Sequence, residues 1–196
     1  MGQPVSRDAI VDMLHSVTRE VLSTMLNLEA QPEESYTEHQ PGKSDGVVSF
    51  VGLAADQWAG TGSLHCESDV ACMLASRFMM CEIAHVDDEV MDAFGELTNM
   101  IIGNFKNQLE SYLGPMALSI PTVVYGKNFS TRSPGHEDWT VVPFVWETNR
   151  LNVRLCLKPR PATHTFPRSG DHPIMAAKKE ISEWVPVGVN LAATLE

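Results

Sequence analysis

A long amphipathic segment, from about Asp87 to Tyr112, places the tightest constraint on how this chain can fold. Apolar side chains recur through it at spacings of three and four residues, the period of one helix face. A charged break at 85–88 precedes the segment, and Gly114-Pro115, a pair typical of helix ends, follows it. We therefore predict one long helix with a buried stripe. The stripe consists of Val90, Phe94, Leu97, Ile101, Phe105 and Leu109.

The flanking segments predict a mixed fold. Residues 6–28 carry another apolar stripe at helical spacing, which includes Met25, and Ser6 is suited to cap that helix. The expected order is helix, two strands, two helices, three strands and a tail. The second helix starts at Ser68 or Asp69 and ends near residue 80; strands are expected at 47–54, 60–67, 116–125, 139–147 and 150–157, with polar loops at 29–46 and 126–138. This order predicts an α+β fold with the helices on one face of a mainly antiparallel sheet.

Two features refine the organisation of the chain. Pro121 interrupts the strand expected at 116–125, and a proline there indicates an edge, an end or a bulge. Residues 1–158 are predicted to form one domain, and residues 159–196 a proline-rich extension. Within the extension a narrow apolar stripe predicts a helix at 173–184, with proline at its first position.

Composition limits the partners and the compartment. The formal net charge is −11 and the pI is near 5.0, so a nucleic acid or an anionic membrane surface would be repelled. No apolar run is long enough for a membrane span, and no signal peptide is visible. The four cysteines form no CxxC pair, and Cys72 and Cys81 are expected to be buried thiols. These features favour a cytoplasmic protein without disulfides.

One polar stripe stands out on the long helix. Asp92, Glu96, Asn99 and Gly103 follow one another at offsets of four, three and four residues, so they share a face. A glycine costs about 1 kcal/mol relative to alanine inside a helix. Close approach of another surface at Gly103 would explain that cost. From spacing alone, an ordinary solvated helix face is the better explanation of the stripe.

The string Asp-Ala-Phe-Gly-Glu-Leu-Thr-Asn-Met-Ile-Ile-Gly-Asn, residues 92–104, resembles the signature of the CheC/CheX/FliY phosphatases. That signature is Asp or Ser, three residues, Glu, two residues, Asn, and a proline some twenty residues later. Here Glu96 and Asn99 fill the two central positions. Pro121 follows Asn99 after 21 residues, one fewer than in the family.

An internal repeat indicates which branch of the family the chain resembles. Residues 11–19 align without gaps on residues 91–99, and the family is built on a pseudo-twofold repeat of this kind. In the first copy, Ser16 and Arg19 stand where the second copy has Glu96 and Asn99. The resemblance therefore implies a single active site, as in the CheX branch.

The resemblance implies a phosphatase that acts on the aspartyl phosphate of a CheY-like receiver. Asn99 would position the attacking water, Glu96 would pair with a receiver lysine, and Asp92 and Gly103 would contact the partner. No cofactor of its own is expected, because the Mg²⁺ would be the receiver's. A homodimer is expected as well, while the cognate receiver stays open.

Other functions were weighed on the same residues. A module that binds a receiver without hydrolysis, as a sink or scaffold, remains the main alternative. A purely structural dimer module is disfavoured by the polar stripe. His85 and His136 each lie near carboxylates but lack the spacing of a metal motif, so no metal site is predicted.

Overall fold

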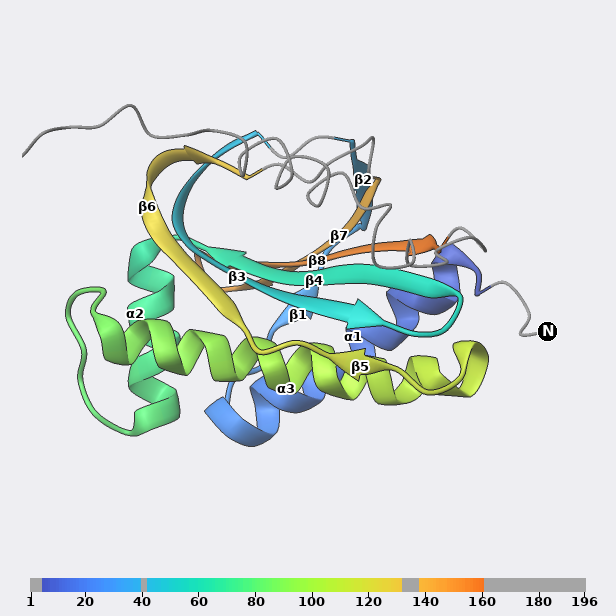
Figure 1. Ribbon diagram of the computed structural model, residues 1–196. Helices are drawn as coiled ribbons and strands as arrows, with labels where there is room; N and C mark the ends of the chain where they lie inside the picture. Colours follow the sequence, from blue (N-terminus) through green and yellow to red (C-terminus); the bar gives the residue numbers. More distant parts are fainter. Residues whose placement is uncertain (1–4, 40–41, 132–137, 161–196) are drawn as a thin grey trace, which may run out of the picture. The chain divides into compact units, whose positions relative to one another are not determined.

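The computed structural model describes residues 5–39, 42–131 and 138–160, and the helix predicted at 173–184 lies outside them (Figure 1). The three helices are α1 (Arg7–Leu26), α2 (Ser68–Met79) and α3 (Asp88–Leu113). Ser6 caps α1 as predicted, because its Oγ accepts a hydrogen bond from the amide of Ala9 at 3.1 Å. Asp87 caps α3 through the amide of Val90 at 3.0 Å.

An antiparallel sheet of eight strands forms the other layer. The strands are β1 (Gln31–Pro32), β2 (Tyr36–Glu38), β3 (Lys43–Ala54), β4 (Trp58–Cys66), β5 (Ala117–Leu118), β6 (Thr122–Ser130), β7 (Trp139–Trp146) and β8 (Asn149–Pro159). Figure 1 shows the helices on one face of this sheet. The predicted α+β fold class is therefore confirmed.

The order of the strands has a regular pattern. The path runs β1-β7-β8-β4-β3-β5, while β2 also pairs with β7 and β6 also pairs with β3. The two halves of the chain occupy equivalent places in this order. β1 and β2 correspond to β5 and β6, β3 corresponds to β7, and β4 corresponds to β8. The pairing of β4 with β8 lies at the centre. As a result, α1 and α3 are each followed by two strands that pair with a hairpin formed later or earlier in the chain, β7–β8 for α1 and β3–β4 for α3.

Several local predictions were wrong at the sheet edges. The loop predicted at 29–46 contains β1, β2 and the start of β3, and β6 continues to Ser130 beyond the strand end expected at 125. These strands form because distant partners supply their hydrogen bonds: β1 and β2 pair with β7. Ion pairs of Glu33 with Arg150 and of Glu38 with the buried Arg154 hold the same segment. Local sequence patterns carry no signal of such pairing.

The core lies between the helices and the sheet. The whole predicted stripe of α3 is buried there, at 2 % exposure or less. Gly62 allows α3 to approach β4 closely, because a β-carbon at this position would lie 2.7 Å from Ile102. On α1, Met25 is 45 % exposed against prediction, and Leu22 and Leu26 fill the core instead.

Two predictions around α2 need correction as well. Glu67 occupies the N-cap position of α2, where Ser68 or Asp69 was expected. Cys81 is exposed, while Cys72 is buried as predicted. The helix ends at Met79, and Met80 adopts the left-handed conformation that turns the chain away from the core. Cys81 therefore follows the chain into solvent.

Candidate functional site

The predicted polar stripe lies on the side of α3 that faces away from the core stripe. Asp92 and Glu96 are exposed, and Asn99 and Gly103 are half-buried. The helix keeps this orientation because its apolar face is fully buried. The buried hydroxyl of Thr98 is satisfied within the helix, where it donates to the carbonyl of Phe94 at 2.8 Å. The carboxylate of Glu96 and the carboxamide of Asn99 thus come from adjacent turns of a rigid element.

A second element runs along this stripe. A β-carbon at Gly103 would lie 3.7 Å from Leu118 of β5, and one at Gly95 would lie 3.5 Å from Pro121. Asn99 lies midway between the two glycines, one helical turn from each. The segment that joins β5 to β6 therefore passes beside the Asn99 turn, and Figure 1 shows this connection running along α3.

This joining segment is fixed to the edge of β3 by hydrogen bonds. The hydroxyl of Ser119 accepts from the amide of Gly52 and donates to the carbonyl of Ile120, each at 2.9 Å. The amide of Ser119 donates to the carbonyl of Gly52, also at 2.9 Å. The segment is thus held in one position, and it presents Ile120 with 86 % of its surface exposed.

The first half of α3 carries strong negative charge. Five carboxylates, two of them in the predicted stripe, lie there without a basic residue among them; they are Asp87, Asp88, Glu89, Asp92 and Glu96. Lys106, further along the helix, is already paired with Glu110 at 2.8 Å. Within the described parts of the chain, the side chains of Glu96 and Asn99 make no hydrogen bond or ion pair. Both polar groups are therefore available to a partner.

Sequence reasoning missed one residue of this site, Gly95. It singled out Gly103 as the point of close approach, yet the contact at Gly95 is tighter: a β-carbon there would lie 3.3 Å from Val123. At Gly103 the neighbouring surface is the chain's own Leu118, at an ordinary contact distance. The signal was present in the sequence, because Gly95 lies inside the same string and directly before Glu96.

The matching positions of α1 have different chemistry. Asp12, Ser16 and Arg19 line a hollow of about 410 Å³ together with His15, Glu20, Ser23 and Glu29. Burial lowers the pKa of His15, and Arg19 acts in the same direction while Asp12 opposes it. Its ring contacts Phe144 edge-on, with 6.1 Å between centroids. An arginine here cannot accept a hydrogen bond from water as the Asn99 carboxamide can.

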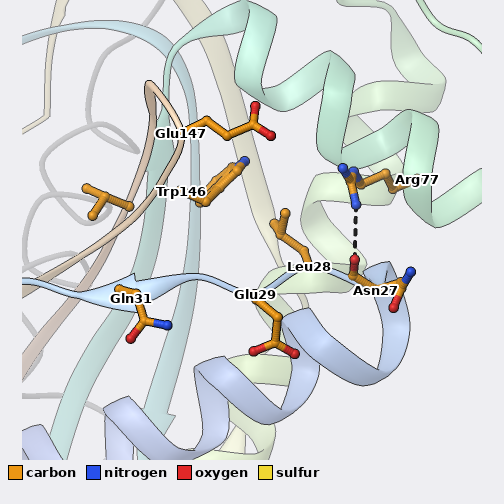
Figure 2. A pocket seen from close by; sticks show the side chains of 8 residues that line it. Asn27, Leu28, Glu29, Gln31, Arg77, Trp146 and Glu147 are labelled. Carbon is orange, nitrogen blue, oxygen red and sulfur yellow. Dashed lines mark hydrogen bonds between the residues drawn. The ribbon is translucent and has the colours of Figure 1, made fainter.

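A larger hollow, of about 600 Å³, lies between the end of α1, α2 and the β7–β8 turn (Figure 2). Its one basic side chain, Arg77, donates to the carbonyls of Leu26 at 3.3 Å and Asn27 at 3.1 Å. These are carbonyls at the C-terminal end of α1, where a cation is favourable. Arg77 therefore serves to hold α1 against α2, and we assign no chemistry to the hollow.

Three further observations concern the described residues as a whole. No three side chains of His, Cys, Asp or Glu are grouped there as a metal ion would require. No disulfide joins any of the four cysteines, and burial raises the pKa of the thiols of Cys66 and Cys72. None of the helices there combines the length and hydropathy needed to cross a bilayer.

Comparisons with known proteins agree with this fold. The family model described as chemotaxis phosphatase CheX matches residues 47–145, which is half of the chain. That match covers all of β4, α2, α3, β5 and β6 and most of β3 and β7, and it ends before β8. No curated protein matches the sequence.

Solved structures share the fold. A CheC-like superfamily protein from Shewanella sp. PV-4 superposes with a TM-score of 0.70 at 24% identity, over 79% of this chain and 99% of that one. CheX from Vibrio vulnificus gives 0.66 at 23% identity, over 76% and 99% of the two chains. The CheX–CheY–BeF₃–Mg²⁺ complex from Borrelia burgdorferi gives 0.66 at 22% identity, over 76% and 97%. At these identities the likeness establishes the fold.

Proposed function

Because the chain belongs to the CheX family of chemotaxis phosphatases, we propose that it hydrolyses the aspartyl phosphate of a CheY-like receiver domain. The observation that carries the proposal is the pair of Glu96 and Asn99 on adjacent turns of α3, both without partners among the described residues. The similar Borrelia structure is a complex with CheY, BeF₃ and Mg²⁺, which supports a receiver as the partner.

Asn99 would act on the attacking water. Its carboxamide oxygen accepts a hydrogen bond from the water, and its NH₂ group donates to a phosphoryl oxygen. The water oxygen attacks phosphorus, the bond to the aspartyl oxygen breaks, and inorganic phosphate and the receiver's aspartate are released, with the water proton passing to solvent or phosphate. The reaction needs mainly positioning, because an acyl phosphate is already reactive. The Mg²⁺ that neutralises phosphoryl charge would be bound by the receiver.

Glu96 would orient the complex. Its exposed carboxylate can pair with a lysine beside the receiver's phosphorylation site, and the surrounding carboxylates of α3 would steer a basic surface toward it. Asp92, one turn earlier, extends the same charged face. Gly103, half-buried against Leu118, would mark the other end of the contact with the receiver. A cytoplasmic location accompanies the proposal, since receivers and cysteines without disulfides belong to a reducing compartment.

Phosphate release from a ³²P-labelled receiver, with and without this protein, tests the proposal. We expect release to accelerate in proportion to the protein added, with each molecule turning over many receivers. Binding to the phosphorylated receiver without any acceleration would replace the phosphatase by a non-catalytic sink or scaffold. All receivers of the source genome should be assayed, since the acidic face selects a class of partner rather than one receiver.

A further inference from the structure

Ile120 is the second most exposed large apolar side chain among the described residues, at 86 %. It lies in the three residues that separate β5 from β6, beside the Asn99 turn. We propose that Ile120 is an apolar anchor that a receiver domain buries when its phosphoryl group reaches Asn99. The inference rests on the proposed function, since it assigns the receiver as the occupant.

The position of Ile120 beside Asn99 brings a docked receiver into contact with it. Leu118 packs at Gly103 and Pro121 packs at Gly95, so residues 119 and 120 run along α3 between these two contacts, beside the turn that carries Asn99. A receiver that delivers an aspartyl phosphate to Asn99 approaches from outside the same stripe. It must therefore cover Ile120 as well, and water leaves this side chain during docking.

The anchor is held in place before the partner arrives. The hydrogen bonds between Ser119 and Gly52 and the packing of Pro121 on α3 fix the backbone on both sides of Ile120. A fixed apolar side chain loses little conformational freedom on binding, so most of its burial contributes to affinity. Its acidic neighbour Glu96 supplies the polar part of the contact, which gives an apolar anchor next to a charged pair.

The receiver is a better occupant than a second copy of this chain. The site requires a partner that carries an apolar patch next to a lysine and a phosphorylated aspartate, and a receiver is such a partner. A second copy would bring its own acidic α3 to this acidic helix, and like charges oppose such pairing. Self-association through Ile120 is therefore treated as an outcome that would overturn the proposal.

The test measures the affinity of the BeF₃-activated receiver, with Mg²⁺, for the wild type and for Ile120→Ser, Ile120→Leu and Met80→Ser. Met80 is the matched control because it is also almost fully exposed, at 91 %, but caps α2 outside the stripe. Ile120→Ser should weaken binding about 10- to 100-fold, since burial of one such side chain accounts for that range. Ile120→Leu should keep most of the affinity, and Met80→Ser should bind as the wild type does.

Turnover separates this inference from the proposed function. At saturating receiver, Ile120→Ser should keep the wild-type kcat, because it changes docking and not the positioning of water. If Ile120→Ser binds the receiver with wild-type affinity, the proposal that Ile120 is an anchor is wrong. It is also wrong if sedimentation shows that Ile120→Ser loses dimerisation while its receiver affinity is kept. If the wild type itself accelerates no receiver's hydrolysis, the phosphatase proposal fails, while the affinity series still decides the anchor.

Discussion

Pro121 packs against Gly95, the residue that directly precedes Glu96: a β-carbon at Gly95 would lie 3.5 Å from the Cβ of Pro121. The proline of the family signature and its helical string are thus neighbours in space. The contact sets how closely the β5–β6 segment approaches α3. It therefore links the backbone around Ile120 to the helix turn that carries the proposed chemistry.

The two glycines of α3 should respond differently to alanine. Gly103→Ala should raise the free energy of unfolding by up to about 1 kcal/mol, since alanine favours the helix and the new contact, at 3.7 Å, is ordinary. Gly95→Ala should gain less, because Val123 at 3.3 Å must move. Urea unfolding of both variants measures the difference.

Activity of the same two variants adds a second comparison. Gly95→Ala should lower kcat by shifting the β5–β6 segment against Asn99, while Gly103→Ala should change kcat less, because its β-carbon meets only Leu118, at an ordinary distance. Equal stability and wild-type activity in both variants would contradict the importance of these close contacts.

Asn99→Ala should abolish most receiver-stimulated hydrolysis while receiver binding is largely kept. The change removes the water-positioning carboxamide and leaves the charges that direct docking. Loss of one positioned catalytic hydrogen-bonding group costs on the order of 10²–10³ in rate. Single-turnover phosphate release and affinity for the BeF₃-activated receiver measure the two effects separately.

Glu96→Ala should instead act mainly on binding. The carboxylate would become buried against a receiver lysine only in the complex, so its loss leaves that lysine without a partner and should cost about 2–5 kcal/mol of affinity. Glu96→Gln should recover only part of it. Ser16→Ala and Arg19→Ala on α1 serve as controls for both residues. If the α1 variants match the losses at Glu96 and Asn99, the single-site assignment is wrong.

Acid should destabilise the fold partly through His15. Burial lowers its pKa in the folded protein from the ordinary value of 6.5, with Asp12 opposing and Arg19 adding to the shift. The unfolded chain then binds a proton more readily than the folded one. The contribution of neutral His15 to the free energy of unfolding is therefore complete above about pH 6.5 and is lost as the pH falls through the folded pKa. His15→Gln should lose less stability than the wild type between pH 7.5 and about 5.5. Parallel urea titrations at the two pH values measure this difference, and equal losses would argue against it.

We further expect a homodimer in solution. β6 and β2 lie at the two outer sides of the sheet, and exposed strand edges tend to be paired or protected. Sedimentation equilibrium at tens of micromolar protein should give twice the chain mass of 21.6 kDa. A monomer at that concentration contradicts the expectation.

The sequence predicted the parts of the fold that local periodicity encodes. All six residues of the α3 stripe are buried, and Ser6 caps α1, because helix period and capping are short-range properties. It did not predict β1 and β2, whose hydrogen bonds come from β7 far along the chain. Met25 was misplaced because the path of the chain after α1 decides which side of the last turn is covered.

The candidate site divides in the same way. Glu96 and Asn99 were found because their spacing and the surrounding string are local, and their proposed roles await the variants above. Gly95 and Ile120 were missed because their importance depends on the β5–β6 segment crossing α3, which is a tertiary contact. No pattern within the string specifies that Gly95 lies closer to its neighbouring strand than Gly103 does.

The exchangeable strand order has a consequence for how the chain reaches its native state. Each half of the sequence gives two strands to the hairpin of the other: β1 and β2 join β7, and β5 and β6 join β3. Without this exchange each hairpin would keep an unpaired edge. Neither half can complete its own layer, so folding must wait for contacts of high sequence separation, which slows it. Cleavage in the connection between α2 and α3 would accordingly yield two fragments that acquire structure only after they recombine.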